Sequence, residues 1–85
     1  MDKSTSPVAW SLLAMELQEA HEHLGQLLAD IASEPNYDED RLRIDLGHLY
    51  AHLNRAWFRR KFDRDLSQAE WEISRQFPSD VGPLA

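Results

Sequence analysis

The sequence predicts an all-α fold, an antiparallel helical hairpin plus a short third helix, because apolar residues recur at helical spacing in two long segments. In each segment these residues are three or four positions apart, which is the period of a helix and not of a strand. A linker of only four residues, 33–36, separates the segments, so the second helix should fold back beside the first. The 85 residues suffice for a single helical domain, residues 1–85.

We expect the first helix over residues 7–33. Ser6 and Pro7 fit an N-cap followed by a proline in the first helical position, where its missing N–H leaves no hydrogen bond unmade. Pro35 ends the pattern, since proline is disfavoured inside a helix. The apolar stripe of this segment, which we expect to face the core, is Trp10, Leu13, Leu17, Ala20, Leu24, Leu27 and Ile31.

We expect the second helix over residues 37–62. Asn36 with Glu39 resembles a capping box, and Asp38 is an alternative N-cap. The acidic residues 38–40 and a basic C-terminal end both suit the helix dipole. The apolar stripe of this segment consists of Leu42, Leu46, Leu49, Leu53 and Ala56, joined by Tyr50 and Trp57.

A third, short helix is expected over residues 68–77. Ser67 and Glu70 form a capping box at its start. Its apolar side chains are too few for a helix that is stable alone, so we expect it to dock on the open end of the hairpin, near Trp10 and Trp57.

A second apolar strip on the second helix has no partner within the predicted hairpin. A core of this size is thin, and the large side chains of the strip need cover. We therefore expect two copies to pair with two-fold symmetry into a dimeric four-helix bundle. The alternative is that the third helix covers the strip within one chain. The strip, and so the expected dimer interface, consists of Ile44, Gly47, Ala51, Phe58 and Phe62.

Charge is distributed unevenly along the chain, whose formal net charge is −6. Residues 1–40 hold nine acidic residues and one basic residue, whereas residues 41–64 hold seven basic and two acidic residues. In a hairpin this puts an acidic tip at the inter-helix turn and a basic end opposite. An antiparallel dimer would bring each acidic tip beside a basic end, and such a contact should weaken with salt.

Composition and patterning disfavour several classes of protein. The chain has no cysteine, which excludes disulfides and thiolate metal ligands. No apolar run approaches the ~20 residues of a membrane span, and the N-terminal sequence lacks the basic and apolar regions of a secretory signal. We therefore expect a cytoplasmic protein without a membrane segment, with a flexible tail over residues 78–85.

Histidine and acidic residues gather at one height of the predicted hairpin. If the turn centres on the linker, residue i lies level with about residue 70 − i. By this rule five candidate metal ligands share one seam between the helices: Glu19, His23, Asp45, His48 and His52. Imidazoles and carboxylates on facing helices suit zinc, iron or manganese. The alternative is a solvated, salt-bridged flank.

Basic residues alternate with aromatic ones in residues 55–64. Such a pattern binds phosphates and stacks on bases, but nucleic-acid-binding domains tend to be basic overall, unlike this chain. Arginine and tryptophan are favoured at protein-binding hot spots, so we expect a protein-binding surface here. Its candidate residues are Trp57, Phe58, Arg59, Arg60 and Phe62.

These observations favour a protein–protein interaction or adaptor module that acts as a homodimer. A metal-binding helical bundle is the alternative, and nucleic-acid binding is the least favoured of the three. The serines fall at caps, helix surfaces or the tail, without a converging base and oxyanion groups, so an enzyme is not favoured. No cofactor beyond a divalent metal is implied.

Overall fold

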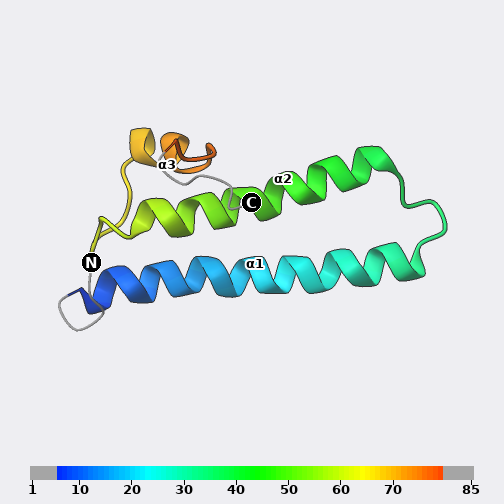
Figure 1. Cartoon of the computed structure of the whole chain (residues 1–85), viewed down its shortest axis with the longest axis horizontal. Coiled ribbons are helices and arrows are strands. Elements are labelled where there is room, and N and C mark those ends of the chain that lie inside the picture. Colours follow the sequence, from blue (N-terminus) through cyan, green and yellow to red (C-terminus); the bar gives the residue numbers. More distant parts are fainter. Residues whose placement is uncertain (1–5, 80–85) are drawn as a thin grey trace.

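A computed structural model describes residues 6–79 of the chain. Within this range the protein has three α-helices and no strand: α1 (Pro7–Ser33), α2 (Glu39–Arg59) and α3 (Gln68–Ser74). Figure 1 shows α1 and α2 as two long neighbouring helices and α3 as a short helix beside α2. The prediction of an all-α fold is confirmed.

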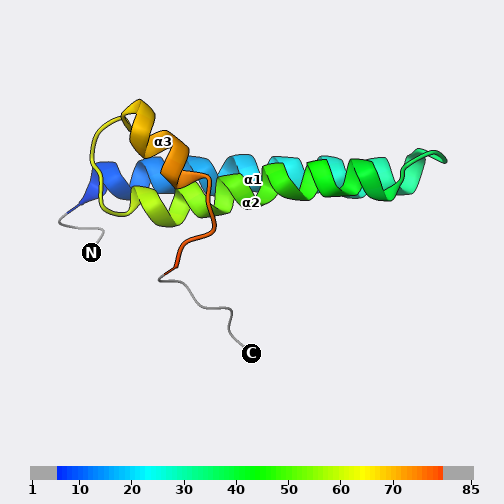
Figure 2. The ribbon, with the colours of Figure 1, turned by 90° about the horizontal axis from the view of Figure 1, so that it is seen from above.

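The helices α1 and α2 run antiparallel and form a hairpin (Figures 1 and 2). Three contacts mark the register between them: Arg41–Asp30 near the turn, His23–His48 in the middle and Arg55–Glu16 toward the open end. In each pair the two residue numbers add up to 71, one more than the sum of 70 that the sequence predicts. The expected alignment of the two helices therefore describes the hairpin closely.

The ends of α1 and α2 are set by local interactions. Ser6 is the N-cap of α1, but its side chain makes no capping hydrogen bond. Asp38, and not Asn36, caps α2, because its carboxylate accepts a 2.9 Å hydrogen bond from the N–H of Arg41. The second helix is shorter than the expected 37–62 at both ends. It begins at Glu39, after its N-cap Asp38, and it ends at Arg59, because residues 60–62 leave the helix.

The helix α3 starts with the capping box that the sequence predicts. The hydroxyl of Ser67 accepts from the N–H of Glu70 at 3.2 Å, and the Glu70 carboxylate accepts from the N–H of Ser67 at 2.8 Å. The helix ends at Ser74, earlier than the expected residue 77. It docks on α2, where the side-chain amide of Asn54 donates to the carbonyl of Arg75 at 3.0 Å.

The apolar core between the helices is small. Among the described residues, the buried apolar ones are three alanines and one leucine: Ala9, Ala20, Leu27 and Ala56. An equal number of polar or charged residues is buried: Glu16, Asn54, Arg55 and Ser74. Two of them, Glu16 and Arg55, pair with each other, so the contact between α1 and α2 depends on charged pairing as well as on apolar packing.

Twelve large apolar side chains of α1 and α2 lie instead on one long face of the hairpin. Six of them are between 41% and 61% exposed: Leu17, Leu24, Leu28, Ile31, Tyr50 and Leu53. Six more are half-buried: Trp10, Leu13, Leu42, Leu46, Leu49 and Trp57. With 3.6 residues per turn, these positions fall in one sector of α1 and one sector of α2, on the side away from α3. We call these twelve residues the leucine face.

The expectation that the two apolar stripes form the core of a single hairpin is confirmed only in part, because three of their fourteen members are buried, six are half-buried and five are exposed. The rotation of α1 explains the difference. Glu16 rather than Leu17, and His23 rather than Leu24, point at α2. Ala20 and Leu27 lie between the leucine face and the side of α1 that carries Glu16, and both are buried.

The strip that the sequence predicts as dimer interface is partly covered by the chain itself. Ala51 and Phe58 line hollows together with α3 and the residues that follow it. Phe62 is half-buried, whereas Ile44 and Gly47 are exposed. The alternative considered from the sequence, cover by the third helix, therefore holds for part of this strip.

None of the helices described has both the length and the apolar character that crossing a membrane would require.

Candidate functional site

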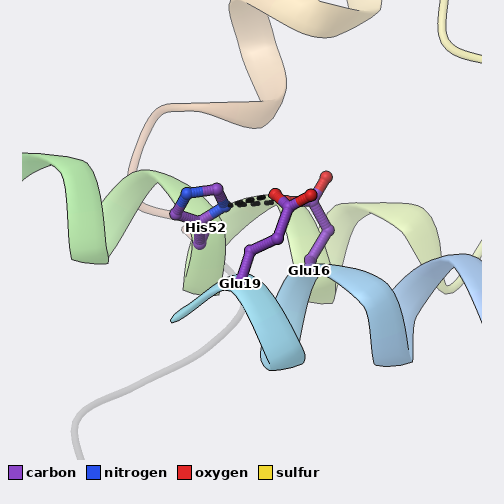
Figure 3. A group of neighbouring side chains, drawn as sticks. All are labelled: Glu16, Glu19 and His52. Carbon is purple, nitrogen blue, oxygen red and sulfur yellow. Dashed lines mark hydrogen bonds and ion pairs between the residues drawn. The ribbon is translucent and has the colours of Figure 1, made fainter. Parts of the chain in front are cut away.

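A buried carboxylate, Glu16, lies at the centre of the contact between α1 and α2. Its side chain is 8% exposed. One carboxylate oxygen, Oε2, accepts hydrogen bonds from Nε of Arg55 at 3.1 Å and from Nε of Arg59 at 3.0 Å. The other oxygen, Oε1, is 3.0 Å from Nδ1 of His52 (Figure 3). One acidic side chain of α1 thus holds three side chains of α2.

Helical spacing explains why these groups converge. His52, Arg55 and Arg59 are three and four positions apart, so they follow one another along the same face of α2. Glu19 is one turn beyond Glu16 on α1 and points to the same place (Figure 3). We call Glu16, Glu19, His52, Arg55 and Arg59 the polar cluster.

Glu16 stays charged in this environment. Burial alone would raise the pKa of its carboxyl group, because a low-dielectric surrounding disfavours charge. The hydrogen bonds from His52 and Arg59 and the charge of Arg55 outweigh burial, and the pKa lies below its ordinary value of 4.5. Two arginines and two carboxylates then balance each other within the polar cluster.

His52 has partners for either state of its Nδ1 atom. This nitrogen is 3.0 Å from Oε1 of Glu16 and 3.3 Å from Oε2 of Glu19, both of which accept a hydrogen bond when Nδ1 carries a proton. It is also 3.2 Å from Nη2 of Arg55, which donates to Nδ1 when the proton is elsewhere. The His52 side chain is 12% exposed, so these partners replace water.

The helix α3 covers part of the polar cluster. The guanidinium of Arg55 lies over the ring of Trp71, 4.3 Å from its centroid. A hollow of about 190 Å³ opens beside Trp71 and is also lined by Leu12 and Met15 of α1. At its edge the Nη1 atom of Arg59 is buried without a hydrogen-bond partner. The helix α3 therefore shields the polar cluster from solvent only in part.

Among residues 6–79, only one group of three histidine or acidic side chains has its ligand atoms close enough together to hold a metal ion, and this group belongs to the polar cluster. Atoms of Glu16, Glu19 and His52 all lie within 4.8 Å of one another. Of the five metal ligands that the sequence predicts, this group includes Glu19 and His52.

The remaining predicted ligands lie close by but do not converge on the same point. The ring of His23 is tilted against that of His52, with centroids 4.9 Å apart, and is 6.3 Å from that of His48. Asp45 is engaged elsewhere, because its carboxylate accepts a 2.6 Å hydrogen bond from the hydroxyl of Tyr37. Burial and this hydrogen bond raise the pKa of Tyr37 to about 12.

Sequence reasoning missed Glu16 and its two arginines. The rule that residue i lies level with about residue 70 − i sets Glu16 beside residue 54, next to Arg55. Glu16 is three residues after Leu13 and four before Ala20, so it shares their side of the helix, which was a further signal, since a charge there must be paired if it is buried.

The basic stretch 55–64 is largely neutralised within the chain. Arg55 and Arg59 pair with Glu16, and Arg64 makes two hydrogen bonds, of 2.8 and 2.9 Å, to the Glu70 carboxylate. The guanidinium of Arg60 lies 3.6 Å from the centroid of the Trp57 ring. Three of the five basic residues in this stretch are thus bound to carboxylates, which reduces the positive charge that could attract the phosphates of a nucleic acid.

Aromatic surface remains at this end of the molecule. The rings of Phe58 and Phe62 lie 5.2 Å apart, and Arg64 covers part of Phe62 with its guanidinium 4.9 Å from the ring centroid. Of the five residues predicted to bind a protein, Arg59 is turned inward to Glu16 and is 13% exposed. The aromatic residues and Arg60 lie together outside the polar cluster.

Comparison with known proteins gives no assignment: no protein family, no curated protein and no solved structure matches the chain.

Proposed function

We propose that the protein is a homodimeric interaction module, in which two hairpins pack through their leucine faces into a four-helix bundle. The observation that carries this proposal is the exposure of six large apolar side chains in one continuous sector of the hairpin. A contiguous apolar surface of this kind marks an interaction site, whereas single exposed apolar residues do not.

Energetic considerations support a second copy as the occupant. Each leucine that becomes fully buried contributes roughly 1.5–3 kcal/mol. The apolar core within one chain consists of three alanines and one leucine among the described residues. Small helical domains with so little core commonly depend on association. A second hairpin offers an apolar surface of the same length and composition.

In this proposal the dimer presents two copies of an aromatic surface to a protein partner, one from each open end. Phe58, Arg60 and Phe62 form this surface, whereas Trp57 belongs to the leucine face. Arginine is favoured at binding hot spots. Because most basic charges nearby are paired within the chain, the surface suits an apolar helix or peptide better than a polyanion.

Substitutions in α1 test the proposed dimer. Leu17→Ser with Leu24→Ser should raise the dissociation constant by more than about 100-fold, because two leucines are lost from each copy. The matched control is Val8→Ser with Met15→Ser. These residues are also exposed on α1, at 51% and 59%, but lie outside the leucine face. Sedimentation equilibrium measures both, and equal association of the two variants would contradict the proposal.

Substitutions at the open end test the aromatic surface. A protein partner that binds the unmodified chain should no longer bind the variant Phe62→Ser with Arg60→Glu. The helix content and the molar mass of this variant should stay the same. Glu72→Gln, an exposed change on α3, serves as the control. Retention of the partner by the Phe62 and Arg60 variant would place binding elsewhere.

A second candidate function is binding of a divalent metal by Glu16, Glu19 and His52. It is supported by ligand atoms within 4.8 Å of one another and by Glu19, which is 52% exposed and open to solvent. We rank it second, because Arg55 and Arg59 already balance the two carboxylates, and Nη2 of Arg55 lies 3.2 Å from the nitrogen that would bind the ion.

Thermal unfolding tests the metal. If the cluster binds Zn²⁺ or Mn²⁺, saturating ion should raise the melting temperature of the native chain, because ligand binding to the folded state stabilises it. Glu19→Gln should remove this increase, whereas Glu22→Gln should keep it. An unchanged melting temperature with both ions would exclude the candidate.

A further inference from the structure

We infer that the second copy lies antiparallel to the first, on a two-fold axis that crosses α1 between residues 20 and 21 and α2 between residues 49 and 50. This inference rests on the proposed dimer and specifies its geometry. Each turn then lies beside the open end of the other hairpin, and α1 packs against α1 of the second copy.

The pattern of the leucine face supports an axis at this height. On α1, Leu17 and Leu24 are equally far from the midpoint between residues 20 and 21, and so are Trp10 and Ile31. A two-fold axis through this midpoint therefore sets each apolar residue of α1 against an apolar residue of the second copy.

The stripe of α2 has the same symmetry about its own midpoint, between residues 49 and 50. Leu46 and Leu53 are equally far from this midpoint, and so are Leu42 and Trp57. The register of the hairpin brings the two midpoints to within about one residue of the same height, since residues whose numbers add up to 71 lie level and the two midpoints add up to 70. A single axis thus serves both helices.

Charge selects the antiparallel arrangement over the parallel one. Between residues 30 and 45 the turn end of the hairpin carries six acidic and two basic residues. A parallel dimer would set two such ends side by side, where like charges repel. In the antiparallel dimer the two turns are separated by the length of the helices, about 40 Å for the 27 residues of α1, which is several Debye lengths at physiological salt.

The open end is the better neighbour for an acidic turn. Three arginines of this end, Arg55, Arg59 and Arg64, are bound to only two glutamates, Glu16 and Glu70, so these groups present no excess of negative charge that would repel the turn. The helix α3 packs against the side of α2 that carries Asn54 and Arg55, which is not the side that carries the leucine face. In Figure 2 the residues that follow α3 cross α2.

Single cysteines distinguish the two arrangements, since the chain has no cysteine of its own. His21→Cys and Leu49→Cys each lie next to the proposed axis. In the antiparallel dimer each variant meets its own copy, so mild oxidation should convert most of either variant alone into a covalent dimer on a non-reducing gel. In a parallel dimer residue 21 would instead face residue 49 of the other chain, and cross-linking would need the two variants to be mixed and refolded together.

Two controls separate the failure of this inference from failure of the dimer. Glu22→Cys points away from the leucine face and reports cross-linking by random collision. The molar mass of the unoxidised variants shows whether they associate at all. Dimers that cross-link only in the mixture would overturn the antiparallel arrangement and keep the proposed function. Chains that sediment as monomers would overturn both.

Discussion

The two long sides of the hairpin contrast in where they bury their side chains. On the side toward α3, charged residues are buried between the helices and pair with one another around Glu16. On the other side, leucines that could have formed that interior are half exposed. A rotation of α1 that brought Leu17 against α2 would take Glu16 away from Arg55 and Arg59 and leave buried charges unpaired. The pairing of a few charged groups thus sets the orientation of an entire apolar stripe.

The largest loss of stability should come from removing the charge of Glu16, on which the buried charged side of the hairpin depends. Glu16→Gln leaves Arg55 and Arg59 buried without a counter-charge, which typically lowers the free energy of unfolding by about 3–5 kcal/mol. Chemical denaturation at a fixed protein concentration measures the loss. The matched control is Glu22→Gln on the exposed side of α1, for which we expect a change within about 0.5 kcal/mol. Equal effects of the two substitutions would mean that the polar cluster does not hold the helices together.

Acid should produce part of the same effect without a substitution. Because the pKa of Glu16 in the folded chain lies below its ordinary value of 4.5, the stability from its charge is fully present above pH 4.5. That stability is lost as the pH falls through the lowered pKa.

The charge of Glu70 also stabilises the fold, and this stability is likewise lost as the pH falls, but over a wider pH range. Hydrogen bonds from Arg64 and Ser67 lower its pKa to about 2, so its contribution declines between pH 4.5 and 2. The free energy of unfolding, measured by chemical denaturation at several pH values, should fall below pH 4.5. The fall should be smaller in Glu16→Gln, which has one carboxyl group with a lowered pKa fewer. An equal fall in the two proteins would show that Glu16 does not contribute to the pH dependence.

The smallest effect should come from the cover over the polar cluster. Trp71→Ala removes the ring from the guanidinium of Arg55, a contact worth about 0.5–2 kcal/mol. Ile73→Ala changes an exposed apolar residue of the same helix and is the control. Hydrogen exchange of the α2 amides near Arg55 should speed up in the first variant only. Faster exchange in both would show that α3 acts through its general packing.

The hairpin, its register and the start of α3 could be predicted from the sequence because they depend on local signals. Helical spacing gives the two long helices, the short linker makes them antiparallel, and Ser67 with Glu70 marks the third helix. The end of α2 could not be predicted, because apolar and basic residues continue beyond Arg59 in a pattern that still suits a helix.

The spacing of apolar residues alone does not predict which side of α1 faces α2. Leu13, Ala20 and Leu27 fit a stripe that continues through Leu17 equally well as one that continues through Glu16. Choosing between them requires knowing that Arg55 and Arg59 lie opposite, which is a property of the folded pair of helices. The observed group of candidate metal ligands differs from the predicted one for the same reason. It includes Glu16, which the sequence did not suggest, and it lacks Asp45, which accepts a hydrogen bond from Tyr37.

The molar mass of the unmodified chain in solution tests the central claim most directly. If a second copy covers the leucine face as proposed, a native mass spectrum at micromolar concentration and neutral pH should be dominated by a species of twice 9.9 kDa. A spectrum that shows only the 9.9 kDa chain, from a sample that is fully helical, would contradict the account.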